Sequence, residues 1–291
     1  MTIAPHTSSI PSKLLHKGST RKHCTASPAI FPLIIINTDA AGLVPVIERF
    51  HLLFLAQFSR RVDKGAFVVK GGCNLRFFHR SIRYSEAMDL DVGEVELQVL
   101  RDKVQEVIAS RPFTQILEAR GIRIDHVTEH KQTSTTQRWK LGLRTEGSDA
   151  PIPTKIEFSR RGLDEGVAFG SIDAEVARVH QLPPLMVSHY DAAAAFRQKV
   201  GALAGRRQTQ ARDVFDLHHL LVTGAGVDAI REVGRRIAER ASANALTVDF
   251  ATFKSQVLVY LHPDEQERYD STSVWESIVM EVVEVLGGGD S

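Results

Sequence analysis

Apolar positions recur with two different periods along the chain, and the mixture of periods changes near residue 182. Before that point, helix-like segments with a period close to 3.6 are interspersed with strand-like runs. The predicted helices are residues 43–62, 73–79 and 95–120, the last with a break near Pro112. The predicted strands are residues 66–70, 84–92, 122–130, 137–144 and 154–159. This order predicts an α+β unit with a mixed sheet.

After residue 182 the apolar positions follow only the helical period. The predicted helices there are residues 191–205, 211–222, 227–241, 248–261 and 273–286. Because a pair of prolines tends to interrupt regular structure, we place a boundary at Pro183-Pro184. The sequence therefore predicts three parts: a flexible or peripheral N-terminal arm (1–40), an α+β domain (41–182) and a helical domain (183–291).

Composition and charge narrow the class of protein. Apolar residues make up 43% and charged residues 24%, which is ordinary for a globular chain. The 36 basic and 35 acidic residues give a net charge of +1, so any basic surface must come from the distribution of charge. Two cysteines exclude a disulfide scaffold and an all-cysteine zinc site. No apolar run is long enough for a membrane span, and we expect a cytoplasmic protein.

Residues 68–92, VVKGGCNLRFFHRSIRYSEAMDLDV, carry the most informative chemical pattern. A strand runs into Gly71-Gly72 and a short helix follows, an arrangement that lets a phosphate approach the backbone. Four alternating positions of the next strand share one face: Ser85, Ala87, Asp89 and Asp91. Carboxylates two residues apart beside a phosphate site suit Mg²⁺, which prefers carboxylate and phosphate oxygens. The alternative interpretation is a surface hairpin with a solvated acidic strand.

Lys70-Gly71-Gly72, Arg83-Tyr84-Ser85-Glu86 and the acidic strand together resemble a known family. This family is the AbiEii/MenT-type nucleotidyltransferase toxins of type IV toxin–antitoxin systems, within the DNA polymerase β-like nucleotidyltransferase superfamily. The resemblance implies that Gly71, Gly72 and Ser85 bind nucleotide. It also implies a metal-binding carboxylate pair two and four residues after the serine.

The chain departs from that family pattern at one position. Four residues after Ser85 stands Asp89, but two residues after it stands Ala87, which cannot ligate a metal. The neighbouring residues Asp89 and Asp91 also satisfy the acidic-x-acidic pattern, so two frames are open. The spacing from the serine favours the frame through Ala87, and in that frame one metal ligand is missing. We therefore expect this chain to transfer nucleotides weakly or not at all.

Two further segments match the family pattern. Glu157, in the run KIEFS, is implied as the third carboxylate, and its alternative interpretation is an ordinary exposed strand residue. Residues 196–203 (FRQKVGAL) and 211–217 (ARDVFDL) resemble the lysine helix and the Arg-Asp-x-x-Asp-Leu helix of the family. The resemblance implies that Lys199 contacts the nucleotide phosphates and is catalytic together with Asp89, Glu157 and Asp216. It also implies that Asp213, the neighbour of Asp216 in the motif, is a nucleotide-binding residue. Without the family resemblance, Asp213 and Asp216 would be interpreted as part of a charge network on the helix surface.

The leading hypothesis is a Mg²⁺-dependent enzyme that transfers NMP from an NTP to an RNA acceptor. In the family, the acceptor is the 3′ end of tRNA, the modification blocks translation, and the antitoxin partner is encoded separately. Basic residues lie close to the motifs and would attract a triphosphate and RNA: Lys70, Arg76, Arg80, Arg83, Lys199, Arg206, Arg207 and Arg212.

Two other hypotheses stay open. One is transfer to a small molecule, as in aminoglycoside nucleotidyltransferases. The other is a catalytically silent protein that binds nucleotide, RNA or antitoxin, and Ala87 is the feature that supports it.

One segment suggests a different chemistry. His126-Val127-Thr128-Glu129-His130 matches the H-x-x-E-H pattern of zinc proteases, which requires a helix to place both histidines on the metal. The surrounding residues are β-branched and strand-like, so we interpret these histidines as strand residues. Cys73, beside Gly72, is interpreted as a small packing residue.

Overall fold

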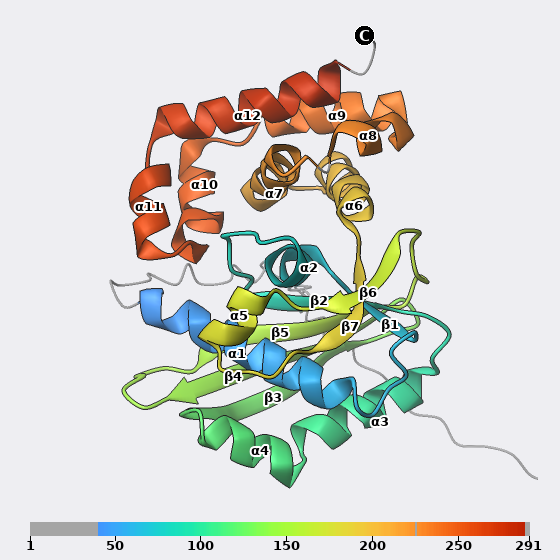
Figure 1. The fold of residues 1–291 in the computed structure, drawn as a ribbon, viewed down its shortest axis with the longest axis vertical. Coiled ribbons are helices and arrows are strands. Elements are labelled where there is room, and N and C mark those ends of the chain that lie inside the picture. The colour runs from blue at the N-terminus through green and yellow to red at the C-terminus, as the bar shows by residue number, and fades with distance from the viewer. Residues whose placement is uncertain (1–39, 225, 289–291) are drawn as a thin grey trace, which may run out of the picture. The chain divides into compact units, whose positions relative to one another are not determined.

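Seven strands form one mixed sheet with the order β3-β4-β5-β2-β1-β7-β6 (Figure 1). The computed structural model describes residues 40–224 and 226–288. The strands are β1 (Phe67–Lys70), β2 (Ala87–Val92), β3 (Ile122–Gln132), β4 (Thr136–Thr145), β5 (Ile152–Ser159), β6 (Val167–Ser171) and β7 (Met186–Tyr190). The acidic strand β2 lies in the middle, antiparallel to β1 and parallel to β5.

The two faces of the central strands have opposite chemistry. Met88 and Leu90 of β2 are fully buried and belong to the same core as Phe58 of α1 (Ala40–Phe58). The helices α3 (Leu97–Ile108) and α4 (Arg111–Glu118) contribute to this core from the same side. Because side chains alternate along a strand, the intervening acidic residues of β2 face the other way. We call this second side the polar face of the sheet.

The C-terminal part of the chain is helical and has a second core. Its helices are α6 (Ala192–Gly205), α7 (Ala211–Val222), α8 (Gly226–Ala229), α9 (Arg235–Ala245), α10 (Phe250–Gln256), α11 (Pro263–Tyr269) and α12 (Thr272–Gly287). Trp275 lies in this core, stacked on Phe253 with ring centroids 4.5 Å apart. No helix in the described part of the chain is long and apolar enough to cross a membrane.

The short helix α2 (Gly71–Phe78) contributes to both cores (Figure 1). Cys73 and Phe77 lie four residues apart on one side of α2 and pack into the sheet core. Leu75, on the opposite side, is fully buried in the helical core. The helix that begins at the glycine pair therefore couples the packing of the two halves.

Most of the predicted elements are confirmed. The predicted helix 211–222 has the bounds of α7, and the predicted break near Pro112 corresponds to the junction between α3 and α4. The predicted helix 227–241 is wrong as a single element, because a 3₁₀ turn (Ile230–Glu232) and Gly234 separate α8 from α9. The predicted helix 248–261 ends earlier, and the unpredicted α11 begins at Pro263, a residue suited to a first helical turn.

The end of the sheet was not predicted. Strands β6 and β7 and the helix α5 (Ala174–Val179) between them were not predicted, and β6 has no buried residue that would mark it in the apolar pattern. β7 follows Pro183-Pro184 and pairs with β1 and β6, so the last strand lies beyond the predicted domain boundary. The predicted N-terminal arm, except Ala40, lies outside the described residues. The three-part division stays a prediction.

The double role of α2 generates a prediction about folding. Replacing the buried Leu75 with alanine should lower the free energy of unfolding by about 2–5 kcal/mol, because it leaves a cavity in the helical core. The chain has two tryptophans, Trp139 in the sheet core and Trp275 in the helical core, so Trp139→Phe and Trp275→Phe backgrounds report each half separately. Both reporters should shift together in urea unfolding followed by fluorescence.

The matched control for this experiment is Leu163→Ala, since the Leu163 side chain is 39% exposed. It should change stability by less than about 0.5 kcal/mol. A shift confined to the Trp275 signal would show that the helical half unfolds on its own and that α2 does not couple the two cores.

Candidate active site

Two predicted carboxylates lie side by side on the polar face of the sheet. Asp89 of β2 and Glu157 of β5 are register partners on neighbouring parallel strands. Both line a pocket of about 100 Å³. The other residues that line it are Lys70, Thr136, Ser159 and Arg161. The structure therefore brings Asp89 and Glu157 together at a site that also carries basic side chains.

The glycine pair is required by close packing against β2 and the loop that precedes it. Gly71 has a φ of +65°, and a Cβ added there would lie 3.0 Å from Oδ2 of Asp89. A Cβ added to Gly72 would lie 2.7 Å from Oγ of Ser85. Any larger residue would clash with these two side chains. The backbone at the start of α2 thus lies directly beside the acidic strand.

Ala87 faces the same side as Asp89, one step along the strand. Its side chain is only 3% exposed, and its register partner on β5 is Lys155. Its carbonyl oxygen accepts hydrogen bonds from Oγ of Ser85 (2.8 Å) and from Sγ of Cys73 (3.3 Å). Cys73 is fully buried, and burial raises the pKa of its thiol, which agrees with a packing role.

Asp91 is bound by protein groups. It is 3% exposed, Nζ of Lys70 lies 2.7 Å from Oδ1, and the Tyr190 hydroxyl donates to Oδ2 at 2.9 Å. Asp91 is not among the residues that line the pocket with Glu157. Ala87 does not line that pocket either, so the choice between the frame through Ala87 and Asp89 and the frame through Asp89 and Asp91 stays a prediction.

Glu157 is held in its ionised form by basic neighbours. Nε of Arg138, on β4, donates to Oε2 of Glu157 at 2.5 Å. Burial alone would raise the pKa of Glu157, but the hydrogen bond and charge of Arg138, with Lys155 and Lys131, outweigh it and lower the pKa. Sequence reasoning missed Arg138, because its pairing with Glu157 follows from the β4–β5 register, in which the two residues are opposite each other.

The predicted residues of the helical half form a separate buried cluster. Asp216 of α7 is fully buried, and Nε and a terminal nitrogen of Arg83 donate to its two oxygens at 2.9 and 2.8 Å. Nζ of Lys199 lies 2.6 Å from Asp216 and 3.0 Å from Asp213. Nε of Arg206 donates to Asp213 at 2.6 Å. Both aspartates are therefore fully engaged in ion pairs.

The basic side chains of this cluster lower the pKa values of its two aspartates. Burial alone would raise the pKa of Asp216, but the charges of Arg83 and Lys199 outweigh it and hold the pKa well below its usual range. The pKa of Asp213 is lowered in the same way, by Lys199 and Arg206 against its burial. Arg83 is 4% exposed and committed to Asp216, so it does not contribute to a solvent-facing phosphate site as its position in the sequence suggested.

The two groups of predicted residues flank the beginning of α2. A Cβ at Gly72 would lie 3.0 Å from a terminal nitrogen of Arg83, which holds Asp216. Gly71 meets Asp89 on the other side. Lys199, Asp213 and Asp216 are not among the residues that line the Asp89–Glu157 pocket. The structure thus places the two clusters next to the same glycine pair without merging them.

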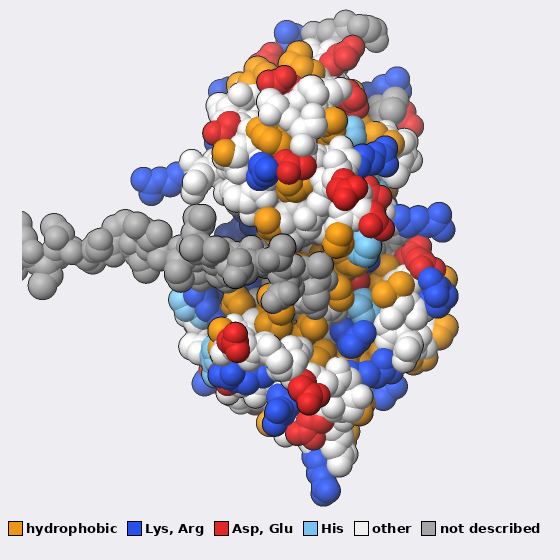
Figure 2. All heavy atoms as spheres, turned by 90° about the vertical axis from the view of Figure 1, so that its left-hand side faces the viewer, with side chains coloured by type: hydrophobic (Ala, Val, Ile, Leu, Met, Phe, Trp, Pro, Cys, Tyr) orange, Lys and Arg blue, Asp and Glu red, His pale blue; other side chains and the backbone are white. Residues whose placement is uncertain are grey.

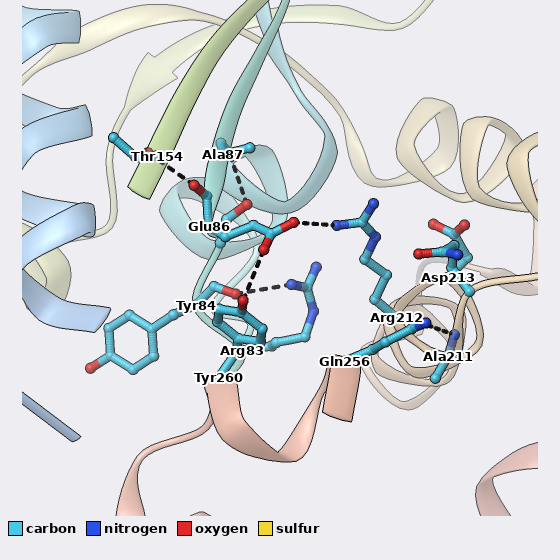
Figure 3. A network of polar contacts seen from close by, with 12 residues as sticks. Arg83, Tyr84, Glu86, Ala87, Thr154, Ala211, Arg212, Asp213, Gln256 and Tyr260 are labelled. Atoms are coloured by element: carbon cyan, nitrogen blue, oxygen red, sulfur yellow. Dashed lines mark hydrogen bonds and ion pairs between the residues drawn. The ribbon is translucent and has the colours of Figure 1, made fainter. Parts of the chain in front are cut away.

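Glu86, in the loop before β2, contacts two residues of the helical part of the chain (Figure 3). The sequence did not predict these contacts. Its Oε1 accepts from a terminal nitrogen of Arg212 at 3.2 Å, and its Oε2 accepts from the hydroxyl of Tyr260 at 2.8 Å. The backbone N–H of Tyr84 also donates to the carbonyl of Tyr260 at 2.9 Å. Arg212 was expected near a triphosphate, but in the structure it binds this glutamate.

The H-x-x-E-H segment lies on β3, as expected for strand residues. The side chains of this motif lie on opposite faces of the sheet. Glu129 contacts Arg101 and Gln105 of α3, whereas His126 is opposite Gly142 of β4 on the polar face. Within residues 40–224 and 226–288, no group of three His, Cys, Asp or Glu side chains could hold a metal ion. The zinc-protease interpretation is therefore not supported by the geometry.

The Asp89–Glu157 pocket nevertheless carries donors that suit magnesium. Both carboxylates and the hydroxyl-bearing Thr136 and Ser159 are oxygen donors. Mg²⁺ is commonly held by one or two carboxylates together with phosphates of the substrate, which does not require a complete protein cage. Asp89 and Glu157 are the residues of this chain that fit such an ion.

A mixed sheet with paired carboxylates next to a Gly-Gly turn is the architecture of a nucleotidyltransferase, and comparisons with known proteins agree. The family model for the nucleotidyl transferase AbiEii toxin of type IV toxin–antitoxin systems matches residues 53–273. The chain therefore belongs to the AbiEii nucleotidyltransferase toxin family. A search of curated proteins found no match.

Solved structures share the fold at low sequence identity. MenT4, the nucleotidyltransferase toxin Rv2826c from Mycobacterium tuberculosis H37Rv, matches with a TM-score of 0.60 and 16% identity, over 87% of this chain and 85% of that one. JHP933 from Helicobacter pylori matches with a TM-score of 0.51 and 17% identity, over 87% and 92%. A putative nucleotidyltransferase from H. pylori has a TM-score of 0.51 and 17% identity, over 84% and 94%.

The buried ion pairs predict how stability depends on Asp216 and on pH. Asp216→Asn should lower the free energy of unfolding by about 3–5 kcal/mol at pH 7, because it leaves the buried Arg83 without its partner charge. The pKa of Asp216 is lowered in the folded state, so its contribution is complete above the unfolded pKa of about 4 and is lost as the pH falls below it. Urea unfolding at several pH values measures this difference.

The gap between the wild-type chain and Asp216→Asn should therefore narrow below about pH 4. Asp264→Asn is the matched control, since the Asp264 side chain is 88% exposed, and it should cost less than about 0.5 kcal/mol. A gap that stays constant down to pH 2 would contradict the assignment of the stabilising charge to Asp216.

Proposed function

We propose that this protein is a Mg²⁺-dependent toxin that transfers NMP from an NTP to an RNA acceptor, the 3′ end of tRNA, and so blocks translation. It would act in the cytoplasm and be neutralised by a separately encoded antitoxin. The observation that carries the proposal is the position of Asp89 and Glu157, side by side in one pocket that adjoins the Gly71-Gly72 turn. Membership of the AbiEii family supports it.

In this proposal, different residues of the site contact different parts of the bound triphosphate. Gly71 and Gly72 have no side chain to obstruct a phosphate at the beginning of α2, where free backbone N–H groups favour anions. Lys70 and Arg161 line the pocket and supply positive charge. A magnesium ion held by Asp89 and Glu157 would neutralise charge on the phosphates and orient the reacting groups. Ser85 fixes the local backbone by donating to the carbonyl of Ala87.

Lys199 is the cation of the helical half that we assign to the nucleotide phosphates. Asp213 and Asp216 hold its ammonium group from two sides, so its position is restricted. In this proposal Asp216 acts through Lys199 and Arg83 and is a positioning residue, since both of its oxygens are occupied by protein cations.

Ala87 favours a second candidate function. With a methyl group where the family has a carboxylate, the acidic site of this chain has two carboxylates in the pocket, and one of them is already bound by Arg138. A catalytically silent protein that binds nucleotide, RNA or antitoxin would keep the fold, the glycine pair and the basic side chains. Catalytic transfer distinguishes the two candidates.

The decisive experiment restores the carboxylate. Radiolabelled NTPs, bulk tRNA and Mg²⁺ are incubated with the wild-type chain, Ala87→Asp, and the uncharged isostere Ala87→Asn. Ala87→Asp should label tRNA at least about 10²-fold faster than the wild-type chain, since losing a preorganised charge-stabilising group typically costs 10²–10³ in rate. Expression of the same variant should inhibit growth more strongly.

The controls isolate the role of the charge. Ala87→Asn should remain as slow as the wild-type chain, and adding Asp89→Asn to Ala87→Asp should abolish the gain. Equal labelling by the wild-type chain and Ala87→Asp would reject the frame through Ala87. No labelling by either chain, with tRNA or antitoxin still bound, would favour the silent binding protein.

A further inference from the structure

Basic side chains extend from the acidic pair across the polar face of the outer sheet. The strand register places six of them on this face of β3, β4 and β5, beyond the pocket. They are Arg123, Lys131, Arg138, Lys140, Arg144 and Lys155. We call this set the basic face. Its members are half-buried or exposed, so they are accessible to a partner.

The basic residues stand opposite one another in like-charge pairs. Lys155 of β5 is the register partner of Lys140 of β4. Towards β3, Arg138 is the partner of Lys131, and Arg144 is the partner of Arg123. Like charges directly opposite each other on neighbouring strands destabilise a sheet. Three such pairs therefore repel each other within one sheet.

Acidic residues offset only part of this charge. Arg138 binds Glu157, which also attracts Lys155 and Lys131, and Arg144 binds Asp125, so two carboxylates face six basic side chains. The exposed His130, which lies at a register irregularity of β3, has a lowered pKa because of the charge of Lys140, with smaller contributions from burial, Arg138 and Lys131. These residues therefore form a field of positive charge beside the acidic pair.

The positive charge is local. The whole chain has a net charge of +1, and the side of the molecule drawn in Figure 2 shows basic and acidic side chains interspersed. Along β4, the basic residues at positions 138, 140 and 144 span about 20 Å at the usual rise of a strand. The track is longer than the pocket that holds the acidic pair. Its charge fits an extended polyanion better than a single nucleotide.

We propose that the basic face binds the phosphate backbone of the acceptor RNA, with the strand running from the Asp89–Glu157 pocket across β5 and β4 towards β3. This inference rests on the proposed function in one respect, the identity of the acceptor as RNA. The phosphates compensate the like-charge pairs, and the end of the RNA strand is directed at the acidic pair.

The test removes one lysine from each strand, in Lys131→Gln/Lys140→Gln/Lys155→Gln. The control removes the same charge from α3, α5 and α9, in Lys103→Gln/Arg178→Gln/Arg236→Gln. Binding of bulk tRNA is measured without NTP at several salt concentrations. The lysine variant should bind at least about tenfold more weakly at low salt, and the slope of log K against log salt should fall by about 2, since each phosphate contact of a single strand contributes about 0.7.

A stability measurement separates binding from misfolding. The substitutions remove like-charge repulsion together with the attraction of Lys131 and Lys155 to Glu157, and because the two losses offset each other, the midpoint of thermal unfolding of the lysine variant should not fall. A lower midpoint would overturn the argument from the like-charge pairs. Equal tRNA binding by the lysine variant and the control would overturn the proposed RNA track, and so would selective loss of antitoxin binding with tRNA binding unchanged.

The proposed function can fail separately from this inference. tRNA binding that depends on the lysines, without labelling by Ala87→Asp, would keep the RNA track and reject the transferase. Labelling of tRNA by Ala87→Asp that is unaffected by the three lysine substitutions, with unaffected tRNA binding, would keep the transferase and reject the track.

Discussion

The buried ion pair between Arg83 and Asp216 is the interaction on which the arrangement of the site depends. It joins residues 133 positions apart, one in the loop before β2 and the other in α7. Burying two charges is costly unless the geometry satisfies both, and here both carboxylate oxygens and two guanidinium nitrogens are engaged. The same arginine lies against Gly72, so the pair also fixes the beginning of α2. Displacing either partner would move the Gly71-Gly72 turn.

The residues that sequence reasoning placed best are those whose roles follow from local spacing. The alternation of β2 correctly put Ala87, Asp89 and Asp91 on one face, and the strand–Gly-Gly–helix order was confirmed. Whether position 87 or Asp91 pairs with Asp89 could not be read from the pattern, because that depends on strand register and on contacts such as those of Asp91 with Lys70 and Tyr190. These contacts arise only when distant strands pair.

Residues that act across the two halves were the least predictable. Glu86 was read as part of a motif, and its contacts with Arg212 and Tyr260 lie 126 and 174 positions away. Arg83 and Arg212 were expected near phosphates because basic residues gathered in the sequence, but both are committed to carboxylates. The outer strands show the same limit: each basic residue of β4 is unremarkable alone, and the like-charge pairs exist only in the register with β3 and β5.

The way β2 is anchored has a consequence for how this gene can change over generations. The bonds at position 87 from Ser85 and Cys73 end on the carbonyl oxygen of Ala87 and do not involve its methyl group. An alanine codon that ends in a pyrimidine becomes an aspartate codon by one base substitution, and Lys155 already stands opposite to balance the new charge. Under the proposed function, an inactive allele and a toxic allele of this gene therefore differ by a single base substitution. A lineage that carries the gene can pass between them without rebuilding the fold.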